Sequence, residues 1–335
     1  MNEGNFMESV KDNIYFNETN FIHIGKGFAL ISIVSAHTAV VNNKSYYLME
    51  YILNSIGTIG VGIFFIFSGY LFYSSNKSFS KFIKKKVYTI LIPWFSLGTL
   101  DFFYVTLRKG GITLLGWLDT LLVHSHLYYL SILILFYIIF FKIRNKQFLL
   151  IIISILSAIS ITLTGLIDIP IYPYINPFNW AIYFILGLWL KKYNLLMYLA
   201  NKFRKWLPFS GLLYGIILTI YLANGAYITY WSYAALLCEV VAISVVFGMT
   251  DWCAGGKNSK WLIYLGKLSF PVYLLHTPFA GILNYLCNRY ELYFLTFFRP
   301  MIVIGLTIIV IEGMSFVGKK LNLTKVVNSI IGVNR

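Results

Sequence analysis

The sequence predicts an all-α polytopic membrane protein with about ten membrane-spanning helices. Of the 335 residues, 59% are hydrophobic and only 12% are charged, whereas a soluble domain usually carries about 25% charged residues. The mean hydropathy of +0.73 agrees with this prediction. Ten spans of roughly 20 residues each would use about 200 positions, which is close to the hydrophobic total. A soluble enzyme, a disordered chain and a nucleic-acid-binding domain therefore fit the composition poorly.

The predicted spans are the apolar runs between clusters of charge, because a span needs roughly 20 predominantly apolar residues. They lie near 22–42, 50–74, 87–107, 125–142, 147–165, 178–190, 210–225, 231–250, 268–287 and 298–316. Residues 108–124, between the third and fourth spans, have the pattern of an amphipathic interfacial or re-entrant segment. We find no internal repeat and no low-complexity tract in the sequence.

These spans divide the chain into three parts. Residues 1–21 are an acidic segment that we expect in the cytoplasm, 22–316 are the transmembrane domain, and 317–335 are a basic cytoplasmic tail. The first 20 residues hold four carboxylates against the single Lys11. That charge is wrong for the basic start of a signal peptide, so we expect the first span to remain in the mature protein.

The net charge of +15 could indicate nucleic acid in a soluble protein, but orientation in a membrane explains it better. Lysine and arginine resist translocation and collect in cytoplasmic loops. If both termini are cytoplasmic, 22 of the 27 basic residues fall on the cytoplasmic side of the ten spans. An odd number of spans would destroy this alternation. The charges therefore predict ten spans with both termini inside.

The sequence predicts no metal site and no disulfide framework. Cys238, Cys253 and Cys287 are widely spaced and form no C-x-x-C pair. His124 and His126 would point roughly 200° apart on a helix, so we do not expect them to share a metal ion. One of these two histidines could instead face the same cavity as a histidine of the first span.

Ionisable residues inside a span are costly, so each is a candidate functional residue. Lys26 and His37 of the first span are eleven residues apart, which places both on one helix face about 16 Å apart along the axis. The lysine could meet an anionic donor near the cytoplasmic surface, and the deeper histidine could accept a proton from a hydroxyl. Equally, Lys26 could extend to the interface while His37 hydrogen-bonds to another helix.

Three other stretches leave a structural and a functional interpretation open. The lysines around 84–86 could form a phosphate-binding rim, or could orient the chain and attract anionic lipids. Small residues among the aromatics of 60–73 could allow close helix packing or line a cavity. In the proline-rich loop 166–177, Tyr172 and Tyr174 could stack on a sugar or belong to the interfacial aromatic belt.

The late span contains His276 between Pro271 and Pro278, which are expected to bend or break that helix. Three carboxylates also fall within predicted spans, where each could pair with a histidine or with a basic residue of another helix. The three are Asp101, Glu239 and Glu312. Their partners cannot be assigned from the sequence.

Five stretches, in this order, resemble motifs of the membrane acyltransferase-3 family, bacterial integral-membrane enzymes that O-acylate surface and exported carbohydrates. They are GKGFALISIVSAH (Gly25–His37), GVGIFFIFSGYLF (Gly60–Phe72), KKKVYTILIPWF (Lys84–Phe95), HLYYLSILILFY (His126–Tyr137) and LGKLSFPVYLLHTP (Leu265–Pro278). Each stretch is weak evidence alone, and the resemblance rests on their order together with ten spans. Lys26 and Tyr128 stand where the family usually has arginine and tryptophan.

The resemblance implies acyl transfer from cytoplasmic acyl-coenzyme A, with acetyl as the expected group, in a bacterial inner membrane. The acceptor would be a hydroxyl of a glycan or lipid-linked sugar at the outer face, and His37 would act as general base. A transporter of a polysaccharide or lipid-linked sugar remains the alternative, since polar groups inside broken helices are equally typical of transporters. A non-catalytic membrane scaffold would leave Lys26 and His37 unexplained.

The positions of basic and small residues agree with this activity and suggest which residues would bind the coenzyme. Basic residues would meet its phosphates, and these are Lys26, Lys84, Lys85 and Lys86. Two small residues would line a gap that passes the thioester arm, and these are Ser68 and Gly69. Three further candidates come from the last two motifs, and these are His126, Tyr273 and His276.

Overall fold

The predicted all-α fold class is confirmed by the computed structural model. It describes residues 3–40, 43–75, 77–123, 125–167, 172–231, 235–256 and 259–333, with side chains except for those of 3–17 and 107–109. Every regular element in these ranges is a helix. In order they are α1 (Glu3–Thr38), η1 (Lys44–Tyr46), α2 (Tyr47–Gly57), α3 (Ile59–Tyr73), α4 (Phe79–Lys86), η2 (Val87–Leu91), α5 (Ile92–Lys109), α6 (Leu114–Leu122), α7 (Tyr128–Ile143), α8 (Gln147–Leu166), η3 (Pro173–Ile175), α9 (Phe178–Lys192), α10 (Leu196–Lys205), α11 (Leu207–Ala223), α12 (Ala235–Ala254), α13 (Lys260–Lys267), α14 (Ser269–Arg289), η4 (Tyr293–Phe298), α15 (Arg299–Lys320) and α16 (Thr324–Ile331).

Each of the ten predicted spans overlaps one or more helices in the part of the chain that the structure describes, as expected for apolar runs whose backbone polar groups must be satisfied within the segment. Within the described residues, six helical stretches are long and apolar enough to cross a membrane. The pair α10–α11, which is bent by 76°, would make a seventh. Helix α7 is apolar but shorter than these stretches. The count of ten spans and the cytoplasmic termini therefore stay predictions.

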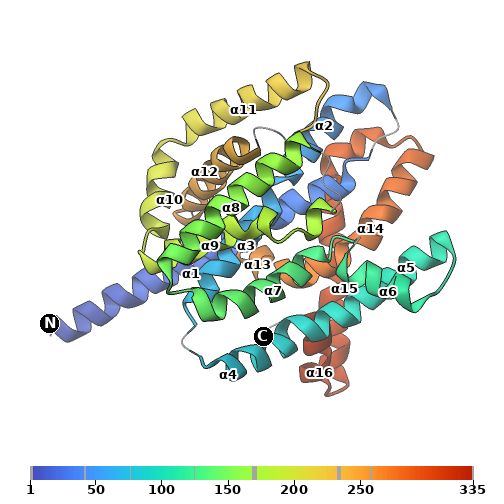
Figure 1. The fold of residues 1–335 in the computed structure, drawn as a ribbon. Helices are drawn as coiled ribbons and strands as arrows, with labels where there is room; N and C mark the ends of the chain where they lie inside the picture. Colours follow the sequence, from blue (N-terminus) through green and yellow to red (C-terminus); the bar gives the residue numbers. More distant parts are fainter. Residues whose placement is uncertain are drawn as a thin grey trace.

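The helices cross the boundaries that the sequence suggested between the three parts of the chain. Helix α1 begins at Glu3 and continues without a break through residues 21 and 22, and its N-terminal end projects from the helical body (Figure 1). The predicted tail contains the end of α15 and the whole of α16. Helix α16 packs against α15 and α5, and Ile331 and Val333 at its end are buried.

Helix α1 lies at the centre of the fold and packs against α2, α3, α12, α13, α14 and α15. On the other side of α3, glycines bring α3 and α9 into close contact. A Cβ atom at Gly69 would lie 2.1 Å from the backbone oxygen of Phe184, and one at Gly187 would lie 2.0 Å from that of Ile66. Small residues allow this kind of approach between membrane helices. The α3–α9 contact positions the face of α3 that points toward α1.

Two irregularities of the helices lie close to the functional residues. Residues Val87–Leu91 form a π-helical turn between α4 and α5, and π-turns often occur at functional sites. Pro93 follows this turn and lacks the backbone N–H that would bond to Thr89 in a regular α-helix. A break at Leu268 separates α13 from α14, just where the predicted span 268–287 begins. Pro271 and Pro278 both lie within α14, which runs from Ser269 to Arg289, so neither proline breaks this helix as the sequence had suggested.

Candidate active site

Three histidines from separate parts of the chain meet in one cluster. His37 lies in the last turn of α1, His126 in the turn before α7, and His276 in α14. The ring centroids of His37 and His276 are 5.0 Å apart, as are those of His126 and His276, and those of His37 and His126 are 5.9 Å apart. His124, the other histidine of that turn, lies outside the described residues.

The hydrogen bonds of His276 fix which ring nitrogen carries its proton. Its Nδ1 lies 2.7 Å from the backbone oxygen of Tyr273. A carbonyl can only accept, so Nδ1 is the donor and Nε2 of a neutral ring keeps its lone pair. This buried Nε2 has no hydrogen-bond partner among the described residues. It is therefore free to accept a proton or a hydrogen bond within the cluster.

A buried carboxylate, that of Asp101, lies close to His126. Oδ2 of Asp101, in α5, lies 4.0 Å from Nδ1 of His126, and the two side chains are 2% and 3% exposed. Thr277 Oγ1 lies 3.0 Å from the same nitrogen. The other carboxylate oxygen, Oδ1 of Asp101, has no partner in the described part of the chain. A carboxylate in this position can orient the imidazole and stabilise a positive charge on the cluster.

His37 and His126 line one wall of a cavity of about 600 Å³, which we call the histidine cavity. His37 is half-buried, so its ring is neither sealed in the core nor fully exposed. The lining also includes Glu50 and Asn54 of α2, together with tyrosines of the loops before α9 and α12. Burial raises the pKa of Tyr174, one of the loop tyrosines that line this cavity. Its hydroxyl thus stays protonated and can donate a hydrogen bond near neutral pH.

A second, smaller cavity of about 180 Å³, which we call the lysine cavity, lies farther toward the N-terminal end of the span in α1. Its lining includes Lys26 of α1, Lys86 of α4, and Thr89 of the π-helical turn. Lys86 donates a hydrogen bond of 3.3 Å to the hydroxyl of Tyr137 and lies 4.5 Å from the centroid of its ring. The described lining contains two ammonium groups and no carboxylate, which suits an anionic ligand.

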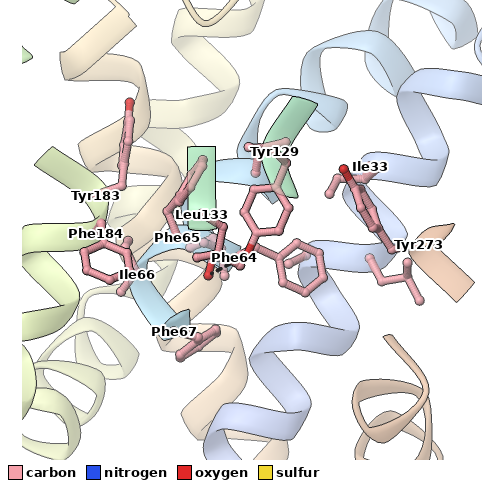
Figure 2. Packing of buried hydrophobic residues seen from close by; sticks show 14 of the residues in the cluster. Ile33, Phe64, Phe65, Ile66, Phe67, Tyr129, Leu133, Tyr183, Phe184 and Tyr273 are labelled. Carbon is pink, nitrogen blue, oxygen red and sulfur yellow. Dashed lines mark hydrogen bonds between the residues drawn. The ribbon is translucent and has the colours of Figure 1, made fainter. Parts of the chain in front are cut away.

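Three aromatic rings pack together where the two cavities share a lining residue. Tyr273 lines both of them, and its ring centroid lies 5.7 Å from that of Tyr129 and 6.3 Å from that of Phe64. The hydroxyl of Tyr273 donates a hydrogen bond to the backbone carbonyl of His126. Figure 2 shows Tyr129 beside Phe64, and Tyr273 next to Ile33 of α1. Phe64, Tyr129 and Tyr273 are called the aromatic layer below.

Other residues predicted for the site are spread over the two cavities and their surroundings. Ser68 lines the lysine cavity and lies 2.9 Å from the hydroxyl of Tyr129. Gly69, the next residue, faces α9 and not the cavity. Lys84 and Lys85 are exposed on α4 and line neither cavity. Tyr273, also predicted for the site, lines both cavities.

The three carboxylates predicted within spans have different surroundings. Asp101 faces His126, whereas Oε1 of Glu312 accepts a 2.6 Å hydrogen bond from the hydroxyl of Tyr264. Glu239 is buried in α12, close to Gly62 of α3. Of the three, only Asp101 joins the histidine cluster.

Sequence reasoning missed several residues of the histidine cavity. Glu50 opens the second predicted span, so the cost of an ionisable group in a membrane could have marked it. Asn54 follows one helical turn later on the same face. Tyr227 and Tyr230 lie in the loop before α12, where nothing in the sequence links them to His37.

A comparison with protein families decides the class of this site. The family model described as an acyltransferase domain matches residues 19–312. The chain belongs to the acyltransferase-3 family. The match runs from α1 into α15 and includes the described lining of both cavities, so this family member is a multi-pass membrane acyltransferase. The comparisons with curated proteins and with solved structures gave no match.

The position of Asp101 generates a prediction about turnover. Asp101→Asn keeps the shape of the side chain but removes its charge. The attraction between that charge and a protonated His126 at 4 Å contributes up to about 4 kcal/mol at an effective dielectric constant of 20. We expect kcat of the acyltransferase to fall roughly tenfold or more, with KM for the acyl donor unchanged. The measurement is thiol release from the donor by protein in nanodiscs, with membranes of a deletion strain as acceptor.

Asp251→Asn is the matched control, because Asp251 pairs with Arg204 at the far end of α12 and lines neither cavity. Unchanged kcat in Asp101→Asn would show that the carboxylate does not support the histidines. A rise in KM alone would place it in donor binding instead.

Proposed function

We propose that this acyltransferase moves an acyl group, expected to be acetyl, from cytoplasmic acyl-coenzyme A to a carbohydrate hydroxyl. The carbohydrate is a cell-surface or exported glycan or its lipid-linked precursor, and the protein resides in a bacterial inner membrane. One observation carries the proposal: the lysine cavity and the histidine cavity lie along one face of α1 and share Tyr273 as a wall.

The lysine cavity supports an acyl-coenzyme A donor. The ammonium groups of Lys26 and Lys86 complement the phosphates of the coenzyme. At about 180 Å³, the cavity is smaller than the roughly 300–1,000 Å³ of most ligand pockets. It therefore has room for the thioester arm and not for the whole coenzyme. The adenosine would lie outside it, where the exposed lysines 84 and 85 of α4 provide further positive charge, and the diphosphate that joins it to the arm would lie next to Lys26 and Lys86.

The histidine cavity supports the chemical step. His37 accepts the proton of the acceptor hydroxyl as the oxygen attacks the thioester carbonyl. The new C–O bond forms, the C–S bond breaks, and the proton passes from the imidazole to the thiolate, which leaves as the free thiol of the coenzyme. The carboxylate of Asp101, through His126, stabilises the positive charge that the cluster carries between these two proton transfers.

The aromatic layer favours a transferase over the alternative, a transporter of a polysaccharide or lipid-linked sugar. A sugar that moved from one cavity to the other would have to displace the packed rings of Phe64, Tyr129 and Tyr273. An acyl group is much smaller than a sugar and needs only a local opening of the layer. The layer also keeps water of the histidine cavity away from the bound thioester, which limits hydrolysis.

The role of His37 is tested in whole cells. His37→Ala and deletion of the gene should both remove an O-acyl mass increment from the surface glycans, because the general base is lost, while the amount of glycan stays constant. Mass spectrometry of the released glycans measures both quantities. His23→Ala is the matched control, because His23 lies on the same helix and lines neither cavity. Accumulation of unmodified glycan inside the cells would support the transporter instead.

The lysine cavity gives a prediction about donor affinity. Lys26→Gln and Lys86→Gln should each raise KM for acetyl-coenzyme A roughly tenfold or more, because a hydrogen bond to a charged group contributes about 1.5–3 kcal/mol. We expect kcat to change much less than KM. Steady-state kinetics of the protein in nanodiscs measure both constants, with the exposed Lys202→Gln on α10 as control. A fall in kcat without a change in KM would contradict the assignment of this cavity to the donor.

A further inference from the structure

The charge of the histidine cavity is unusual for such a basic protein. Its described lining contains one carboxylate, Glu50, and no lysine or arginine, although the chain has 27 basic residues against 12 acidic ones. All the lysines that line either cavity belong to the lysine cavity. The two cavities therefore differ in the charge that they can accept.

Glu50 belongs to a polar stripe formed by α2 and Thr58, the residue that follows it. Glu50, Asn54 and Thr58 are spaced four residues apart, so they lie on one helix face, and all three line the histidine cavity. Glu50 and Asn54 are half-buried, which leaves their polar atoms accessible from the cavity. Carboxylate, amide and hydroxyl groups in a row can pair with the successive hydroxyls of a sugar ring.

Tyrosine rings of two loops complete the same cavity. Tyr172 and Tyr174 lie before α9, with ring centroids 5.3 Å apart, and Tyr230 of the loop before α12 lies 6.2 Å from Tyr174. Such rings offer flat apolar faces with negative potential at their centres. They stack on the C–H face of a sugar and attract an ammonium group, but they do not attract an anion.

An anionic sugar would meet unfavourable electrostatics in this cavity. Proteins usually bind sugar carboxylates and phosphates with the bidentate fork of arginine or with lysine, and the described lining has neither. The anion would instead lie near the carboxylate of Glu50, and like charges brought together at a binding site are strongly disfavoured. A neutral sugar or an amino sugar meets no such repulsion.

We infer that the acceptor sugar is neutral or carries an amine, and that Glu50 selects it against uronic, sialic and phosphorylated sugars. This inference rests on the proposed function and adds to it the class of sugar that receives the acyl group. Glu50 accepts hydrogen bonds from hydroxyl or ammonium groups of that sugar, while His37 faces the hydroxyl that is acylated.

The experiment compares surface glycans from a deletion strain that carries the wild-type gene, Glu50→Gln or no gene. Tandem mass spectrometry identifies the monosaccharide that bears the O-acyl group. We expect a neutral or amino sugar. Glu50→Gln should lower the initial rate of acylation roughly tenfold, because the charged carboxylate that accepts hydrogen bonds from the sugar is replaced by a neutral amide of the same shape. Glu291→Gln, a change of the same kind at an exposed site outside both cavities, should have no effect.

Each alternative result has a distinct meaning. An acyl group on a uronic, sialic or phosphorylated sugar would overturn the inference while leaving the proposed acyl transfer intact. An unchanged rate in Glu50→Gln, with equal amounts of protein in the membrane, would remove Glu50 from acceptor selection. Glycans with the same acyl content with and without the gene would overturn the proposed function itself.

Discussion

The hydroxyl of Tyr273 donates a hydrogen bond to the backbone carbonyl of His126, and this bond joins the aromatic layer to the histidine cluster. Tyr273 thereby contributes to both cavities, and its own backbone carbonyl accepts from Nδ1 of His276. One residue of α14 thus lines both cavities and also sets the proton position on a histidine. The proposed chemistry depends on this arrangement, because the donor must stay apart from water and from the acceptor until the acyl group moves.

Helix α1 determines the distance over which the two substrates are brought together. Lys26 and His37 lie on one face of this helix, and Ile33 lies between them beside Tyr273 (Figure 2). A continuous helix fixes their separation at about 16 Å along the axis, which suits a long thioester arm with its phosphates at one end. The close packing of α3 on α9 through Gly69 and Gly187 positions α3, and Phe64 of α3 contributes to the aromatic layer.

The sequence alone predicted the fold class and the spacing of Lys26 and His37, because helical periodicity and the cost of charge in a membrane are local properties. The sequence could not distinguish the role of Ser68 from that of its neighbour Gly69. Ser68 lines the lysine cavity, whereas Gly69 faces α9. The proximity of Asp101 to His126 depends on how α5 packs near the turn before α7, and Glu50 lines the same cavity as His37 only because of the tertiary structure. Neither arrangement has a local signal.

In the proposed mechanism, the lysine cavity opens to the cytoplasm, the histidine cavity opens to the outer side, and the aromatic layer lies between them. Single cysteines test it most directly, introduced as Asn54→Cys in the histidine cavity and Thr89→Cys in the lysine cavity, with the three native cysteines replaced by alanine. We expect a membrane-impermeant maleimide to modify only the first variant in intact cells and only the second in inverted vesicles. Labelling of both positions from the same side would contradict the account.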